Sequence, residues 1–517
     1  MVQDLGSLHV ILISALFALT WIPSIKGGWV SDDWEGIWKF SDRWDAKARK
    51  KIDTYEHPVG KEKKPFKNTA FNPHITFPGS VIRWLRLNLG KRYQVIGKDA
   101  KNHEVYGYVQ SPVRHHAISL IVHYVTVLLL YSAFSQILGP TTTFFALLLF
   151  IVHPVSAQTV AWCSGIGYLL CLFGMAAGLN VALLTSGTTQ FLAVLPFMFL
   201  SAYGLFSGAF NWVIFAFLGL WPACIASFLV FCINGVIQGK QIVGHRTGEF
   251  KKQNMAKSTV INFRKPIVMA KTLWYYVRLV FFPKRLGLFH KWGYHYDAKI
   301  ERFDGLFLAG IIALAVMGWG FFNGPLPVQL GILWFLTYLI VFSNFITAMQ
   351  FVVDRYAFIP SLGICLILTS LLPAELYWVV LGIFLMRTWT HLPTFKSETD
   401  FYLSNVFNFP DSEVAYGNLG VTYMNSGRPG SAIDTWLQSI KINDQYDVPH
   451  FNLYSIYKSQ GMLELAKKYL DSCLSSKVVH FPQDWEKERE ILLRKIDARK
   501  PILDQLRKAD KKYGGKI

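Results

Sequence analysis

The chain has 517 residues, of which 52% are hydrophobic and only 16% are charged, and its formal net charge is +19. This composition is too apolar for an ordinary soluble protein of this length, and it indicates an integral membrane protein with some polar segments. In such a protein, excess Lys and Arg is typical of basic loops and lipid contact. No nucleic-acid motif accompanies the charge, so we expect membrane lipids and not nucleic acid as partners.

Apolar runs long enough to cross a membrane recur along the chain up to residue 391. The first run lacks a basic leader and a small-residue cleavage site, so we expect a retained first span. A long polar loop at 26–113 and a shorter one at 237–264 interrupt the series. The eleven expected spans are 7–25, 114–137, 141–159, 164–185, 189–206, 211–236, 265–283, 304–322, 326–348, 355–373 and 375–391.

The orientation of these spans is predicted from the loop at 237–264. Its only acid is Glu249, and it is short enough for the positive-inside rule to apply, so it should be cytoplasmic. The 26–113 loop is also basic, but loops above about 60 residues translocate largely regardless of charge. Counting spans then places the N-terminus in the cytoplasm and both the 26–113 loop and the C-terminal region outside. The basic residues of 237–264 are Lys240, Arg246, Lys251, Lys252, Lys257 and Arg264.

The C-terminal region contains a repeat with a period of 34 residues. This period, with small residues where two helices must approach, resembles tetratricopeptide repeats. We expect a repeat region at 396–480, with clear repeats at 413–446 and 447–480, and a basic capping helix or tail at 481–517. So short an array favours a bacterial protein, in the cytoplasmic membrane with periplasmic repeats. The equivalent pairs are Leu419 and Leu453, Tyr423 and Tyr457, Gly427 and Gly461, and Ala432 and Ala466.

Six short elements occur in an order that points to a family. They read VSDDW, RHHAISLIVHY, HPVSAQTVAW, FFPKRLGLFH, DRYAFIPSLG and SETDFY. With them, the chain resembles bacterial multi-span membrane proteins with C-terminal tetratricopeptide repeats, over roughly residues 7–475. These proteins are related to the transmembrane-and-tetratricopeptide-repeat O-mannosyltransferases of the GT-C glycosyltransferase class. The expected fold is therefore all-α: a GT-C-like bundle of about eleven spans over 1–395, followed by the helical repeat region.

The resemblance implies transfer of a sugar from a polyprenyl phosphate to a protein hydroxyl on the outer face of the membrane. The lipid-linked sugar is the only ligand it implies. Such a transfer needs a carboxylate that accepts the acceptor's proton, and Asp33 or Asp32 fits this role. Adjacent carboxylates repel, which can raise the pKa of one of them. The alternative is that both are solvated or cap a helix. The acids Asp32, Asp33 and Glu35 are equally well explained by solvation, so no metal site is predicted.

Cationic side chains must also stabilise the departing donor phosphate. Arg355 is a candidate for bidentate contact, although it equally fits a structural pair with the supporting residue Asp354. Lys284 and Arg285 either bind phosphate or, more simply, contact anionic lipid headgroups. His153, in the HPVSAQTVAW element, completes the donor-phosphate set that the resemblance implies.

His116 and His123 are two further supporting positions. They are seven residues apart, nearly two helical turns, and so share one face of a span. Polar residues in spans usually face the bundle interior, so we expect structural hydrogen bonds from both.

Several charges of the family are missing from this chain. Ser156 and Gln158 stand where the family has His and Glu, Ile166 and Tyr168 stand at charged positions, and Phe77 replaces an arginine. These departures favour a second hypothesis, a catalytically inactive scaffold or accessory subunit that binds proteins through its repeats. The retained acids, the histidines and Arg355 favour the enzyme, which is the function that we expect, with the scaffold as the alternative. A transporter is less well supported, because ionisable residues are scarce inside the spans.

Overall fold

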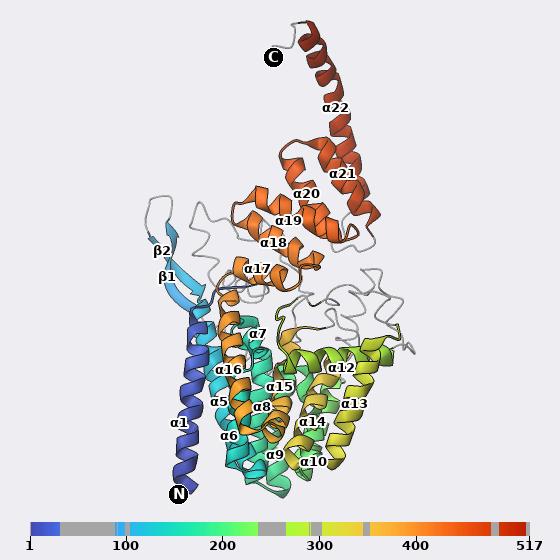
Figure 1. Cartoon of the computed structure of the whole chain (residues 1–517). Coiled ribbons are helices and arrows are strands. Elements are labelled where there is room, and N and C mark those ends of the chain that lie inside the picture. Colours follow the sequence, from blue (N-terminus) through green and yellow to red (C-terminus); the bar gives the residue numbers. More distant parts are fainter. Residues whose placement is uncertain are drawn as a thin grey trace. The chain divides into compact units, whose positions relative to one another are not determined.

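The computed structural model describes residues 2–30, 88–89, 91–98, 104–235, 265–288, 290, 302–344, 352–476 and 485–512. Helices make up most of this part of the chain, which confirms the expected all-α class (Figure 1). The chain forms two compact units. The first comprises Met1–Val243, Phe263–Leu288 and Asp297–Phe401, and the second comprises Gly244–Asn262, Phe289–Tyr296 and Tyr402–Ile517.

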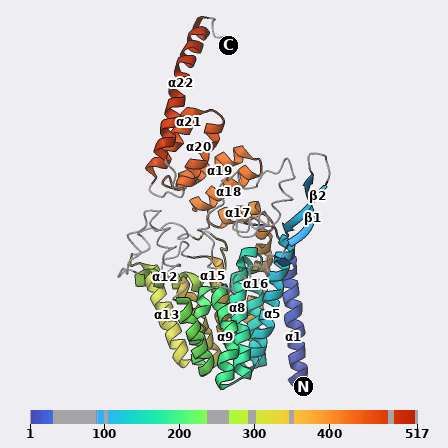
Figure 2. The same ribbon diagram turned by 180° about the vertical axis from the view of Figure 1, so that it is seen from behind.

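The first unit is a bundle of long apolar helices that run antiparallel to their neighbours (Figures 1 and 2). Tight connections join them; between α5 and α6, for example, Gly139 has a φ of 83° and Pro140 begins the next helix. The long helices are α1 (Val2–Trp21), α5 (Pro112–Leu138), α6 (Pro140–Val152), α8 (Ile166–Leu184), α9 (Gly187–Gly204), α13 (Gly305–Asn323), α14 (Leu326–Leu339), α15 (Asp354–Leu371) and α16 (Ala374–His391).

Five helices in the described part of the chain are long and apolar enough to cross a membrane, and they indicate a membrane protein. They correspond to the expected spans at 7–25, 114–137, 164–185, 304–322 and 355–373. The count of eleven spans is not confirmed, because the other apolar segments are shorter, more polar or interrupted helices. The five are Gly6–Lys26, Pro112–Leu138, Cys163–Leu184, Gly305–Asn323 and Asp354–Leu371.

The expected span at 211–236 is instead a helical hairpin. The helix α10 (Trp212–Phe217) ends at a turn in which Gly219 has a φ of 71°, and a second helix at Trp221–Gly235 runs back beside it. A side chain is strained at this φ, so glycine permits the break. Both ends of the hairpin therefore lie at the same end of the bundle. Two ring contacts fix the antiparallel pairing: Phe210 with Phe231, at 5.1 Å between centroids, and Trp212 with Phe228, at 5.6 Å.

The expected span at 265–283 is also wrong, because α12 (Lys265–Phe281) lies across one end of the bundle (Figures 1 and 2). Near its start, Lys271 Nζ donates to Asp304 Oδ2 at 2.6 Å, just before α13 begins. Further along, Tyr276 Oη accepts from the backbone N–H of Val353 at 3.2 Å, just before α15 begins. Lys271 and Arg278 are seven residues apart, nearly two turns, and so lie on one edge of the helix, where Lys271 is buried against Asp304 and Arg278 is exposed. The exposed Arg278 favours an interfacial position for the helix.

These two differences also affect the expected topology, because the span count on which it rests passes through both segments. The helix at Trp221–Gly235 runs back past Phe210, and α12 lies across the end of the bundle at which α1 and α16 finish. We call this the basic end, and Lys26, Arg355 and Lys396 mark it. The 237–264 loop therefore does not begin opposite the 26–113 loop, as the span count had placed it. The opposite or far end holds the connections α5–α6, α8–α9, α13–α14 and α15–α16 (Figure 1).

Shorter elements cluster at the basic end. They are η1 (Ile22–Lys26), α7 (Ser156–Val160), η3 (Cys163–Gly165), η4 (Phe206–Phe210), η7 (Ile340–Phe342) and η8 (Leu392–Phe395). An antiparallel pair of strands, β1 (Lys91–Lys98) and β2 (Glu104–Gln110), precedes α5. This hairpin was not expected, because the 26–113 segment was read only as a polar loop. The helix α17 (Glu398–Asn408) continues the chain toward the second unit.

The second unit contains two helix pairs, α18 (Glu413–Asn425) with α19 (Pro429–Ile442) and α20 (Asp447–Ser459) with α21 (Leu463–Ser475). In each pair a glycine with positive φ makes the turn: Gly427 at 72° and Gly461 at 73°. Ala432 and Ala466 are fully buried where the helices meet. The expected 34-residue spacing thus appears as two equivalent helix pairs, while their classification as tetratricopeptide repeats stays a prediction.

A final helix, α22 (Trp485–Lys512), packs on the second pair at the position expected for a capping helix. Its Leu492 and Ile496 join the apolar core of the helix pairs. Glu488 accepts hydrogen bonds from Lys458 and Tyr454 of α20, and these bonds hold the pKa of Glu488 below its usual value. Apolar contacts and a charged network therefore both attach α22.

Candidate functional site

The structure brings most of the expected site residues together at the basic end. His153 ends α6, Asp354 and Arg355 begin α15, and Lys284 and Arg285 follow α12. These segments are far apart in sequence. They meet because the antiparallel helices return the chain repeatedly to the same end. Asp32 and Asp33, the expected catalytic pair, lie outside the described residues.

His153 joins α6 to α12. Its Nδ1 accepts a hydrogen bond from the Val155 backbone N–H at 3.3 Å, so the proton of the neutral ring is on Nε2. That nitrogen donates to the Val280 carbonyl at 3.1 Å. The ring packs on Phe384 at 4.6 Å between centroids and is fully buried. Both ring nitrogens are therefore engaged within the protein, and the geometry gives His153 a structural role.

Asp354 fixes the loop that follows α12. Its side chain is fully buried, and its Oδ2 accepts from the Gly287 backbone N–H at 2.6 Å. A hydrogen bond this short to a carboxylate is of the charge-assisted kind, which is stronger than a neutral one. Asp354 thereby ties the start of α15 to residues 282–288, and its carboxylate faces the protein interior and not solvent.

Arg355 is half-buried and stacks on aromatic rings. Its guanidinium carbon lies 4.9 Å from the centre of the Trp162 ring and 5.4 Å from that of Tyr356. Its backbone N–H donates to Gln158 Oε1 at 2.8 Å. Stacking on both rings holds the plane of the guanidinium group in a fixed orientation. Gln158, at a position where the family has an acid, acts here as a neutral acceptor for the backbone of α15.

Lys284 and Arg285 have exposed side chains on a fixed backbone. Arg387 of α16 donates from Nε to the Pro283 carbonyl at 3.2 Å and from a terminal nitrogen to the Lys284 carbonyl at 3.0 Å. Arg387 thus holds the backbone of this loop, and the side chains of Lys284 and Arg285 are directed outward at the basic end.

The two histidines of α5 differ. His116 is buried, and its Nε2 lies 3.4 Å from the Gly28 carbonyl oxygen and 3.5 Å from Cys163 Sγ, so it has the expected structural contacts. His123 is also buried, but neither ring nitrogen has a hydrogen-bond partner. The expected hydrogen bond for His123 is wrong, because this residue lies two turns deeper, within an aromatic shell. The shell rings are Phe17, Trp21, Phe150 and Phe358, with centroids 5.3, 5.9, 5.9 and 5.7 Å away.

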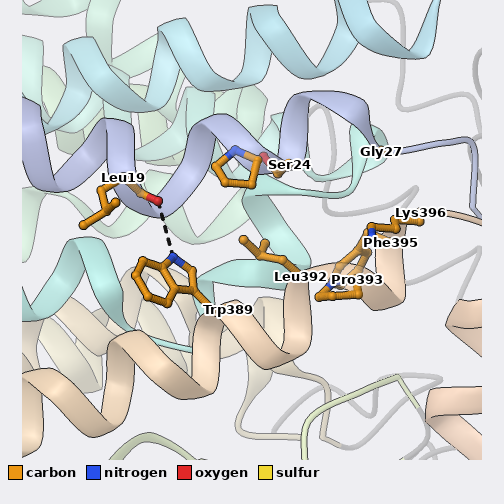
Figure 3. A pocket seen from close by; sticks show the side chains of 9 residues that line it. Leu19, Ser24, Gly27, Trp389, Leu392, Pro393, Phe395 and Lys396 are labelled. Atoms are coloured by element: carbon orange, nitrogen blue, oxygen red, sulfur yellow. Dashed lines mark hydrogen bonds between the residues drawn. The ribbon is translucent and has the colours of Figure 1, made fainter.

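A cavity of about 340 Å³ lies between the ends of α1 and α16 (Figure 3). Trp389 Nε1 donates to the Leu19 carbonyl at 3.3 Å along its wall. Most of the lining is apolar, and the exposed Lys396 supplies the cation. This combination fits an apolar chain with an anionic group at one end. The lining residues are Leu19, Pro23, Ser24, Gly27, Trp389, Leu392, Pro393, Phe395 and Lys396.

Beyond the cavity, burial raises the pKa of Glu398 at the start of α17 to about 7. Among the residues that the structure describes, no three His, Cys, Asp or Glu side chains come together in the manner of a metal site.

Several residues important to this end were missed by the sequence analysis. Trp162 supplies the ring under Arg355, and Arg387 holds the loop of Lys284. Arg387 carried a usable signal, since it is a charge within an otherwise apolar segment. Trp162 ends the HPVSAQTVAW element, but nothing there distinguished it as a ring for Arg355, because an aromatic residue near a span end is common.

Comparison with known proteins finds no matching family model, no similar curated protein and no similar solved structure.

Proposed function

We propose that the chain is a GT-C-like membrane protein that acts as a scaffold or accessory subunit, and that its C-terminal helix pairs bind a protein partner. The observation that supports this function best is the use of polar groups at the basic end. Asp354 holds the Gly287 backbone, His153 holds the Val280 carbonyl, and Gln158 holds the Arg355 backbone. These groups connect helices to one another and do not present their charge to a substrate.

The helix pairs support the second part of the proposal. Two pairs and a capping helix form a compact α-helical unit with its own apolar core. Stacked helix pairs of this kind offer an extended protein-binding surface. The described helices of the bundle pack on one another without such a unit, so recognition of another protein is its proposed role.

Purification from native membranes in mild detergent tests the proposal. The wild-type chain should carry a protein partner in a fixed ratio. Ala432→Trp should lose that partner, because a fully buried alanine between two helices has no room for an indole; overpacking typically costs about 1–3 kcal/mol. The matched control is Gln438→Trp, on the exposed side of the same helix, which should keep the partner. Equal partner recovery from Ala432→Trp and wild type would contradict the proposal.

A second candidate function is sugar transfer of the GT-C type, and Arg355 is the observation that favours it. Its guanidinium group is stacked yet half-exposed, an arrangement suited to a phosphate. In that function Asp33 or Asp32 would act as the base and a polyprenyl-phosphate sugar as the donor. Arg355→Lys keeps the charge but loses the planar bidentate edge, so it should impair transfer strongly in an enzyme. In a scaffold it should leave partner recovery unchanged.

A further inference from the structure

The two ends of the bundle carry very different charge. Exposed basic side chains gather at the basic end, before α13, after α12 and beyond η1 and η8. The far end has none, since residues 1–25, 115–239, 303–354 and 356–386 contain no Lys or Arg. Glu375, at the start of α16, is an exposed acid at that end. The exposed basic residues in the described part of the basic end include Lys26, Arg278, Lys284, Arg285, Arg302 and Lys396.

The difference in charge lies close to the helix ends, where Lys and Arg determine how a membrane protein is oriented. The far-end connections are short, and the basic residues lie within a few positions of helix ends, the range over which the positive-inside rule operates. The same rule applied to the 237–264 loop gives the opposite orientation only when 211–236 and 265–283 are counted as crossings, and the structure shows a hairpin and a transverse helix there.

Apolar side chains accompany the basic ones at the surface. Phe282 is 74% exposed beside Lys284, and Phe303 is 76% exposed beside Arg302. A helix lying across the bundle end, with flanking cations and exposed phenylalanines, fits the boundary between headgroups and acyl chains. Anionic headgroups attract cations held at this depth. The apolar cavity with Lys396 at its edge matches the same ligand chemistry, an acyl chain with an anionic head.

We propose that the basic end contacts the anionic lipid headgroups of the cytoplasmic leaflet, so that this end faces the cytoplasm and the far end faces outward. The chain leaves the bundle at the basic end after α16, and none of the described helices that follow is among those long and apolar enough to cross a membrane. The helix pairs are then cytoplasmic, and so is their partner. This inference goes beyond the scaffold function, which holds for either orientation.

Cysteine labelling in intact cells tests the orientation on the full chain. In a Cys232→Ser background, Ser186→Cys places a thiol in the exposed α8–α9 connection at the far end, and Arg302→Cys places one at the basic end. A membrane-impermeant maleimide should label Ser186→Cys in intact cells and Arg302→Cys only after permeabilisation. Labelling of Arg302→Cys in intact cells would overturn the proposal, whether or not Ser186→Cys also reacts.

The lipid contact has its own test. Protein reconstituted with equal phosphatidylglycerol and phosphatidylcholine should retain several-fold more of the anionic lipid after delipidation. The triple variant Arg278→Glu, Lys284→Glu, Arg285→Glu should lose most of this enrichment. Arg494→Glu with Lys495→Glu, at exposed positions of α22, is the matched control and should retain it. Equal enrichment in the triple variant and wild type would show that the basic end does not bind anionic lipid.

Discussion

Substitution of Asp354 tests whether its carboxylate has a structural role or a catalytic one. In Asp354→Ala the buried Gly287 N–H loses its acceptor at 2.6 Å. A hydrogen bond to a charged group contributes about 1.5–3 kcal/mol, and a buried donor left without a partner costs about 1–3 kcal/mol. The two contributions partly describe the same free-energy change, so they are not added in full. The free energy of unfolding should therefore decrease by about 2–4 kcal/mol. Asp354→Asn keeps an acceptor of similar shape and should lose about half as much.

The assay is the temperature at which half of the detergent-purified protein leaves its monodisperse chromatographic peak. Asp354→Ala should lower this temperature clearly, with Asp354→Asn between it and wild type. Glu375→Ala is the control, because Glu375 is an exposed acid in the first turn of another helix and should change little. An unchanged midpoint in Asp354→Ala would refute the structural role, and loss of a transferase activity at full stability would assign the carboxylate to chemistry.

Three further predictions follow from other contacts. Ala432→Trp should destabilise the second unit, seen as faster proteolysis of the C-terminal region, while Gln438→Trp should not. The raised pKa of Glu398, about 7, means that the native state binds more protons than the unfolded state between about pH 4.5 and 7, so this group lowers stability as pH rises through that window. Glu398→Gln should therefore exceed wild type in thermal stability at pH 8, with the difference vanishing near pH 4; a constant difference would contradict the shift. Asp304→Ala removes the helix cap of α13 and the ion pair with buried Lys271, so it should lower stability by at least about 1 kcal/mol; an unchanged midpoint would contradict this.

Length and continuous hydrophobicity made the five long apolar helices predictable. The two errors in the span count have local causes. Gly219 turns an apolar run into a hairpin, and a single glycine within such a run is an ambiguous signal. In α12, Lys271 and Arg278 are spaced as on one helical edge, but the high apolar content of the segment masks this signal. The 34-residue repeat predicted both helix pairs because Gly and Ala must occupy the turns and close contacts.

The site was less predictable than the fold. The alternation of spans predicted that one end of the bundle holds His153, Asp354 and Arg355. Their partners did not, because the Val280 carbonyl, the Gly287 N–H and the Gln158 side chain come from segments whose packing no local pattern encodes. The expected hydrogen bond of His123 failed for the same reason, since burial among aromatic rings depends on four separate helices.

The most direct test of the scaffold function is the double variant Asp32→Asn, Asp33→Asn in the native host. It removes both carboxylates of the expected catalytic pair while keeping side chains of similar size. Surface glycoproteins and recovery of the protein partner are measured together. The scaffold function predicts that both stay at wild-type levels. Loss of a general base typically lowers a rate about 100- to 10,000-fold, so disappearance of a glycoprotein class with the partner still bound would contradict it.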